Sequence, residues 1–274
     1  MDIYFAYHLH TKDEIVIALL SDLGFESFVE EDELTTAYIN DVTRTEEVKN
    51  TIEQILLEYQ VTYQVEEIQP QNWNALWEAS FTPVHVDEFC VVRADFHKKD
   101  PYVLHDIVIN PKMAFGTGHH ATTFMMLSAM ENIDFFEKKV FDYGAGTGIL
   151  AILADKLGST QIDALDIESE SYENIKENAE INGTKHVIAI HGTLDNIPAE
   201  SVYDIILANI NRNILIQSVS GLYKRLIPDG VLLLSGILVE DKSIIEETYF
   251  ENGFSTLFFT EKDGWVCIAM KKTH

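Results

Sequence analysis

The first 68 residues alternate between two hydrophobic periods, one typical of helices and one typical of strands. Residues 12–23 and 46–59 repeat apolar side chains every three or four positions, which predicts two amphipathic helices. Short runs rich in β-branched and aromatic residues predict strands over residues 3–7, 27–30, 35–39 and 61–65. The order β-α-β-β-α-β is that of a small ferredoxin-like α+β domain.

From residue 115 onward the pattern changes to strands that alternate with helices, which predicts a parallel α/β sheet. We expect strands over residues 140–143, 162–166, 186–190, 203–208 and 230–234. We expect helices over residues 149–157, 169–182, 212–226 and 242–252. Strands 255–259 and 265–270 then form a hairpin around Lys262-Asp263-Gly264. A parallel sheet that ends in such a hairpin resembles the Rossmann-like sheet of the class I methyltransferase fold.

Residues 69–110 connect these two parts. Strands are expected at residues 89–93 and 106–109, so the segment is a linker followed by a β-rich entry segment. Trp73 and Trp77 lie four positions apart, on one face of a predicted short helix. We interpret them as packing residues rather than as a hinge or substrate platform. The predicted domains are therefore residues 1–68, 69–110 and 111–274.

Composition places the protein in the cytoplasm. Hydrophobic residues make up 46% of the 274, enough for a substantial core. No run approaches the ~18 apolar residues of a membrane span, and the start lacks the basic and apolar regions of a signal peptide. The two cysteines, Cys90 and Cys267, are too few for a disulfide framework.

Charge narrows the class of partner. The chain has 19 basic and 45 acidic residues, a net charge of −26, which repels nucleic acid at long range and attracts a basic protein. Residues 1–65 contain fourteen Asp or Glu and three Lys or Arg. This part is therefore a candidate binding module for a basic protein, although acidity that serves only solubility explains the composition equally well.

A glycine loop follows the strand that ends at Asp142. Gly144, Gly146 and Gly148 have the spacing G-x-G-x-G and precede a predicted helix. Glycine allows positive φ and lets the backbone approach a ligand, and the helix N-terminus adds free amide donors. The spacing is not the dinucleotide fingerprint, and Asp142 would repel a pyrophosphate. A carboxylate here suits the amino group of S-adenosylmethionine, which carries no phosphate.

Polar residues end two further strands. Asp166 lies at a strand end, where a carboxylate accepts hydrogen bonds from both ribose hydroxyls of a nucleoside cofactor. Asn209 follows the strand 203–208, at the sheet edge where ligands of α/β folds bind. We expect Asn209 to accept a hydrogen bond from an incoming amine and to orient its lone pair. Asn211 is interpreted as a helix N-cap.

One segment carries a more specific resemblance. The sequence Met113-Ala114-Phe115-Gly116-Thr117-Gly118-His119-His120-Ala121-Thr122-Thr123, with Ala208-Asn209-Ile210 and residues 234–238, closely resembles the ribosomal protein L11 methyltransferase family. The resemblance covers nearly the whole chain and is most family-specific at 114–123. The family usually has Thr-His-Pro where this chain has His119-His120-Ala121, and an apolar residue in place of Asn211.

This resemblance implies a function and a site. It implies transfer of methyl groups from S-adenosylmethionine to lysine side chains and the N-terminal α-amine of ribosomal protein L11, free or on the ribosome. It implies that the N-terminal domain recognises that protein and that the linker lets it swing. It also implies that Thr123, Gly144, Asp166 and Asn209 contact the cofactor, while the loop from Phe115 to Thr122 closes over it.

Three alternatives stay open. Asn209-Ile210-Asn211 is weakly similar to the Asn-Pro-Pro-Tyr motif of RNA and DNA amino methyltransferases, so an enzyme that acts on RNA is the first. An NAD-dependent oxidoreductase is the second, and a non-catalytic binding module that kept the fold is the third. A metal site is not expected, since the adjacent His119 and His120 have no carboxylate close by. No residue is marked as a general base, so water or a carbonyl is expected to take the proton.

Overall fold

The computed structural model describes residues 3–31, 34–68, 81–110 and 116–273. The predicted helix around Trp73 and Trp77, and the predicted cofactor contact of Phe115, lie outside these residues. The chain consists of two compact units, Met1–Ser80 and Phe81–His274. No helix of the described residues is long and apolar enough to cross a bilayer.

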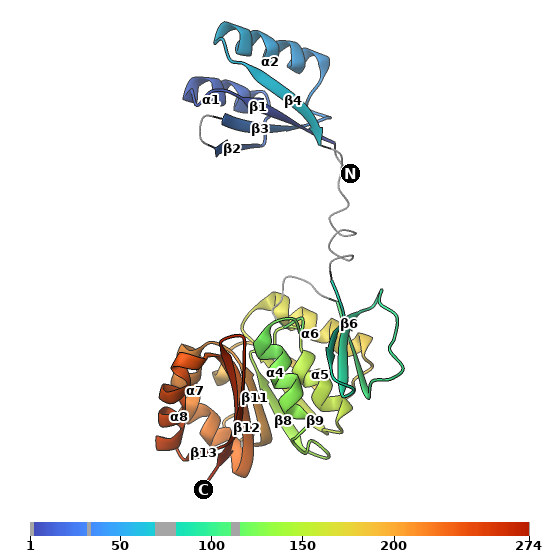
Figure 1. The fold of residues 1–274 in the computed structure, drawn as a ribbon, viewed down its shortest axis with the longest axis vertical. Coiled ribbons are helices and arrows are strands. Elements are labelled where there is room, and N and C mark those ends of the chain that lie inside the picture. Colours follow the sequence, from blue (N-terminus) through green and yellow to red (C-terminus); the bar gives the residue numbers. More distant parts are fainter. Residues whose placement is uncertain (1–2, 32–33, 69–80, 111–115, 274) are drawn as a thin grey trace. The chain divides into compact units, whose positions relative to one another are not determined.

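The first unit has the predicted ferredoxin-like order. Its elements are β1 (Tyr4–Leu9), α1 (Glu14–Asp22), β2 (Ser27–Glu31), β3 (Leu34–Asn40), α2 (Glu46–Glu58) and β4 (Tyr63–Ile68). The sheet order is β2-β3-β1-β4, and all neighbouring strands are antiparallel. Both helices lie on one face of the sheet (Figure 1). Their apolar residues, such as Leu20 and Leu56, form one buried cluster with Leu9 and Ile39 of the sheet. The unit therefore has a hydrophobic core of its own.

A seven-stranded sheet forms the centre of the second unit. Its strands are β8 (Lys139–Tyr143), β9 (Gln161–Asp166), β10 (Val187–His191), β11 (Tyr203–Asn209), β12 (Leu226–Leu238), β13 (Phe254–Lys262) and β14 (Trp265–Lys272). The order is β10-β9-β8-β11-β12-β14-β13. The first five strands are parallel, and β14 is antiparallel to both its neighbours. This confirms the predicted α/β sheet with its antiparallel hairpin.

Helices cover both faces of this sheet (Figure 1). The helices α4 (Ala121–Met130), α5 (Ile149–Lys156) and α6 (Ser169–Ile181) lie on one face, and α7 (Arg212–Arg225) and α8 (Lys242–Glu251) lie on the other. Two short 3₁₀ helices, η1 (Leu194–Asn196) and η2 (Val239–Asp241), precede α7 and α8. Each face has a separate buried cluster, one around Leu150 and one around Leu222.

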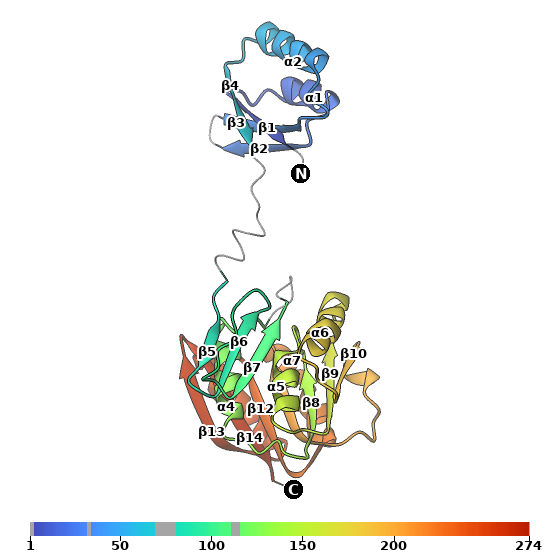
Figure 2. The same ribbon diagram turned by 90° about the vertical axis from the view of Figure 1, so that its right-hand side faces the viewer.

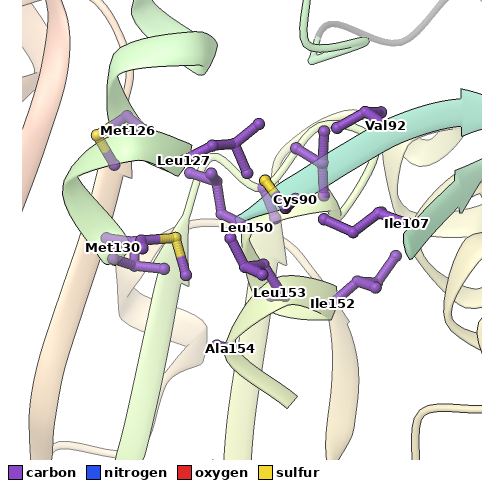
Figure 3. Packing of buried hydrophobic residues seen from close by; sticks show 14 of the residues in the cluster. Cys90, Val92, Ile107, Met126, Leu127, Met130, Leu150, Ile152, Leu153 and Ala154 are labelled. Carbon is purple, nitrogen blue, oxygen red and sulfur yellow. The ribbon is translucent and has the colours of Figure 1, made fainter. Parts of the chain in front are cut away.

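A second, three-stranded sheet covers α4 and α5. Its strands are β5 (Val84–Val86), β6 (Cys90–Ala94) and β7 (His105–Ile109), in that order (Figure 2). Figure 3 shows Cys90, Val92 and Ile107 packed against Leu150 and Leu153 of α5. The described part of the entry segment therefore shares the core of the second unit. Burial raises the pKa of the Cys90 thiol to about 12, as expected for a packing residue.

Among the α-helices and strands, three differ from the sequence-based expectation. The strand β5 was not predicted, because three residues are too few to show an alternating pattern. The helix α4 was not predicted, because eight of its ten residues are buried and its apolar positions show no amphipathic period. The strand β12 begins at Leu226, four residues before the predicted start, because Leu226 pairs with Tyr203 across a register shift. The hairpin turn is as tight as the sequence indicated. Asp263 and Gly264 both have positive φ, 51° and 80°, as two-residue hairpin loops require.

Candidate functional site

A cavity of about 890 Å³ opens at the carboxyl ends of β8, β9 and β11. Strand order reverses between β8 and β11, and ligands of open α/β sheets bind at such a switch point. Its wall combines the glycine loop, apolar side chains and carboxylates. The residues of the wall include Gly144, Gly146, Leu165, Asp166, Ile167, Glu168, Glu170, Asn209, Ile210, Asn211 and Ile214.

The glycine loop brings main chain to the cavity wall. Gly144, Gly146 and Gly148 have φ of 76°, 56° and 78°, in the left-handed region that favours glycine. A Cβ at Gly144 would lie 2.2 Å from Cγ2 of Ile210, so the loop also has no room for a side chain there. The amides of Gly144 and Ala145 donate to the Leu165 carbonyl at 2.9 and 3.0 Å. These bonds tie the loop to β9.

Asp166 joins the loop to the end of β9. Its Oδ2 accepts from the Gly146 amide at 2.8 Å and its Oδ1 accepts from the Glu168 amide at 3.0 Å. A carboxylate oxygen has a second lone pair, so each still has one acceptor site. Asp166 is buried but forms part of the wall. Its position is therefore compatible with two vicinal hydroxyls of a ligand.

Asn209 presents an unused acceptor at the same cavity. Its Nδ2 donates to Thr123 Oγ1 at 3.3 Å. Its Oδ1 is buried and has no hydrogen-bond partner among the described residues. A buried polar atom without a partner costs about 1–3 kcal/mol. The atom is therefore a candidate for a ligand's N–H or for polarised C–H groups. Thr123 itself does not form part of the wall.

Asp142 lies behind the loop rather than on the cavity wall. Its side chain is 1% exposed, and its Oδ2 accepts from the amide of Ala151, the third residue of α5, at 3.1 Å. Its Oδ1 has no partner among the described residues. Burial, and then the charge of Asp166, raises its pKa to about 7 against the opposing hydrogen bond. Its predicted contact with a cofactor amine stays a prediction.

Residues of the 119–121 segment and Asn211 have local roles. His120 is the N-cap of α4 and accepts from the Thr122 amide. The His119 ring lies 2.9 Å from the Thr82 carbonyl oxygen. Asn211 caps α7 by accepting from the Ile214 amide at 3.1 Å, as predicted, and also lines the cavity. Within the described residues, no three His, Cys, Asp or Glu side chains are arranged to hold a metal ion.

Sequence reasoning missed a row of asparagines on α6. Asn174, Asn178 and Asn182 are four residues apart, and Asn178 donates to the Thr147 carbonyl inside the glycine loop. Their spacing places all three amides on one helix face. That spacing is visible in the sequence but resembles an ordinary polar face. The apolar wall residues Ile167 and Ile214 carried no motif at all.

The composition of the wall indicates which ligand it suits. Asp166, Glu168 and Glu170 are acidic, and no Lys or Arg occurs among the described residues that line the cavity. A pyrophosphate would be repelled, whereas a cation is favoured. Leu165, Ile167 and Ile214 give an apolar surface for a flat ring. Carboxylate, glycine backbone and the free Asn209 acceptor together fit S-adenosylmethionine.

Comparison with known proteins places this site in a family. The model of the family described as ribosomal protein L11 methyltransferase (PrmA) matches residues 9–273. A ribosomal protein L11 methyltransferase of Bacteroides thetaiotaomicron is 36% identical over 97% of this chain and 98% of its own. One from Porphyromonas gingivalis is 38% identical over 95% of this chain and 91% of its own.

Solved structures agree. The crystal structure of a ribosomal protein L11 methylase from Lactobacillus delbrueckii subsp. bulgaricus superimposes with a TM-score of 0.65 at 29% identity, over 71% of this chain and 100% of that one. A methyltransferase from Pyrococcus furiosus, at 15% identity and a TM-score of 0.52, shares the fold. The chain thus belongs to the ribosomal protein L11 methyltransferase family, whose members are S-adenosylmethionine-dependent.

Proposed function

We propose that this protein transfers methyl groups from S-adenosylmethionine to lysine side chains and the N-terminal α-amine of ribosomal protein L11. The observation that carries the proposal is Asn209, which lines an acidic cavity beside the glycine loop and whose buried Oδ1 has no hydrogen-bond partner among the described residues. We propose that a substrate amine satisfies this acceptor, in a chain whose family is named for methylating ribosomal protein L11.

Four of the proposed cofactor contacts, Gly144, Gly146, Asp166 and Asn209, line the cavity. The backbone at Gly144 and Gly146 lies against the cofactor, and Asp166 accepts from the ribose hydroxyls. Thr123 acts through its hydrogen bond to Asn209. Phe115 and Asp142 complete the proposed set, although Phe115 lies outside the described residues and Asp142 lies behind the loop rather than on the wall. When bound, S-adenosylmethionine supplies a methyl carbon already activated by the sulfonium.

The protein aligns the substrate amine with the methyl carbon and removes water from around the amine. A lysine amine has a pKa of ~10.4 and is protonated in water. Desolvation in a cavity with apolar residues such as Leu165 and Ile214 lowers that pKa and favours the neutral nucleophile. Asn209 Oδ1 then accepts one amine hydrogen and directs the lone pair to the methyl carbon. As the N–C bond forms, the C–S bond would break and S-adenosylhomocysteine would leave, and the methylammonium product then loses one proton to water or to a carbonyl.

The partner is proposed from the negative charge of the first unit, and the compartment from the composition and the low cysteine count. An acidic first unit attracts a lysine-bearing protein and does not read nucleic acid. The partner is ribosomal protein L11 in its free or ribosome-associated form, and the enzyme acts in the cytoplasm.

The test is a methyl-transfer assay with purified unmethylated ribosomal protein L11, followed by peptide mass mapping. We expect methyl groups on lysines and on the N-terminal amine. The Asn209→Ala variant should lower kcat about 100-fold at saturating cofactor, the usual cost of one positioned polar group. Asn213→Ala, a neighbour that does not line the cavity, serves as the control. Full turnover by Asn209→Ala would remove the positioning role.

A further inference from the structure

Three asparagine side chains of α6 connect this helix to the edge of the small sheet. Asn174 and Asn178 lie on one face of α6 and are fully buried, and Asn182, the C-cap of α6, follows at the same spacing. Opposite them runs β7, the edge strand of the order β5-β6-β7. An edge strand has main-chain groups without strand partners. The asparagines satisfy those groups.

The hydrogen bonds imitate strand pairing. Asn182 Oδ1 accepts from the Val108 amide at 3.0 Å, and its Nδ2 donates to the Val108 carbonyl. Asn178 Oδ1 accepts from the Asn110 amide at 2.8 Å, and Asn174 donates to the Asn110 carbonyl. Four helical residues rise about 6 Å and two strand residues about 6.6 Å, so the two repeats match.

Asn178 also bonds to the glycine loop, which Asn182 does not, and its Nδ2 donates in addition to Asn174 Oδ1 at 3.3 Å. Its Nδ2 donates to the Thr147 carbonyl at 2.8 Å, between Gly146 and Gly148 of the glycine loop. Thr147 is fully buried, and its hydroxyl donates to the Gly116 carbonyl at 2.6 Å. One amide group therefore fixes the loop main chain and the end of β7 at the same time.

We propose that Asn178 is a positioning residue for cofactor binding, because it holds the glycine loop at the distance from α6 that the cofactor requires. The inference rests on the proposed placement of S-adenosylmethionine against Gly144 and Gly146. An amide is needed because the site requires a donor toward Thr147 and an acceptor toward Asn110. Aspartate keeps the acceptor but turns a carboxylate oxygen toward the Thr147 carbonyl, which repels it.

The experiment compares Asn178→Asp with Asn182→Asp in the full-length protein. Both variants add one negative charge to the same helix face, and both remove a donor from the row. The probe is S-adenosylhomocysteine, whose net charge is zero, so the added charge has little direct effect on binding. We expect calorimetric titration to give a Kd at least tenfold weaker for Asn178→Asp, and within twofold of wild type for Asn182→Asp.

Turnover gives a second readout that general destabilisation does not produce. For Asn178→Asp the KM for S-adenosylmethionine should rise at least tenfold, while kcat at saturating cofactor stays within about threefold. Thermal melting of both variants shows whether they are equally folded. Should Asn178→Asp not fold, the pair Asn178→Ala and Asn182→Ala replaces it, with the same order of affinities expected.

Three outcomes would overturn the inference. Unchanged affinity of Asn178→Asp for S-adenosylhomocysteine would show that the bond to Thr147 does not position the glycine loop for cofactor binding. Equal losses in both variants would show a general effect of the asparagine row. Failure of the wild-type protein to bind S-adenosylhomocysteine would instead refute the proposed cofactor site, and the inference with it. The wild-type titration therefore separates the two failures.

Discussion

At the scale of single residues, the buried carboxylate of Asp142 behind the glycine loop makes the stability of the protein depend on pH. Its pKa is raised from 3.8 to about 7, so the folded protein holds a proton that the unfolded chain releases between these values. The free energy of unfolding therefore falls as pH rises through this window and levels off above it. The sequence indicated an acidic residue before the loop, but the direction of its side chain depends on the packing of β8 and α5.

The prediction concerns Asp142→Asn, which removes the titration and keeps an acceptor for the Ala151 amide. As pH rises from about 5.5 to about 8, the free energy of unfolding of the variant should increase by about 2 kcal/mol relative to that of wild type. Urea unfolding of the cofactor-free proteins measures this, and the range avoids the isoelectric point near 4.5. If the free energies of unfolding of the two proteins changed in parallel with pH, the raised pKa of Asp142 would be contradicted.

A second residue-scale prediction concerns Gly144→Ala. A Cβ at this position is strained by the φ of 76° and meets Ile210, which lines the cavity. We expect the Kd for S-adenosylhomocysteine to weaken at least tenfold. Gly183→Ala is the matched control, since Gly183 has a φ of 65° with nothing within 4 Å of its Cβ. The control should cost about 1 kcal/mol of stability without loss of affinity; equal affinity losses in both would refute the proposed role of the loop.

At the scale of elements, hydrophobic period determined what could be predicted. The strands of the large sheet and its hairpin have clear signals, so their order along the chain was predicted. The helix α4 is buried nearly all round, so no amphipathic stripe marks it. The pairing of Asn178 with Thr147 joins residues far apart in the chain, and no local pattern encodes such a contact. Asp166, which the sequence marks at a strand end, lines the cavity, whereas the wall residues brought in by tertiary packing, such as Ile167 and Ile214, carried no signal.

An element-scale prediction concerns the ion pair between β6 and β7. Arg93 binds both carboxylate oxygens of Asp106, at 2.7 and 2.9 Å, and both side chains are nearly buried. Arg93→Ala leaves a buried charge without its partner and should cost about 3–5 kcal/mol. Lys176→Ala removes an exposed pair with Glu173 and should change stability far less than Arg93→Ala does. Chemical denaturation of both variants measures the difference, and equal costs would contradict the account.

At the scale of the whole molecule, we expect net charge to affect binding of the partner protein but not binding of the cofactor. The net charge of −26 includes a strongly acidic first unit, whereas the cofactor cavity lies in the second. Raising salt from about 50 to about 300 mM shortens the range of attraction between exposed charges. The KM for ribosomal protein L11 should rise at least threefold, while the Kd for S-adenosylhomocysteine stays constant. A KM independent of salt would show that charge does not guide this encounter.

The central claim is that this chain methylates a ribosomal protein rather than RNA. The most direct measurement incubates unmethylated ribosomes with the enzyme and S-adenosylmethionine labelled in its methyl group, and then separates protein from RNA. The account predicts label in ribosomal protein L11 with the wild-type enzyme and about 100-fold slower labelling with Asn209→Ala. Label in the RNA fraction, or none in ribosomal protein L11, would contradict it.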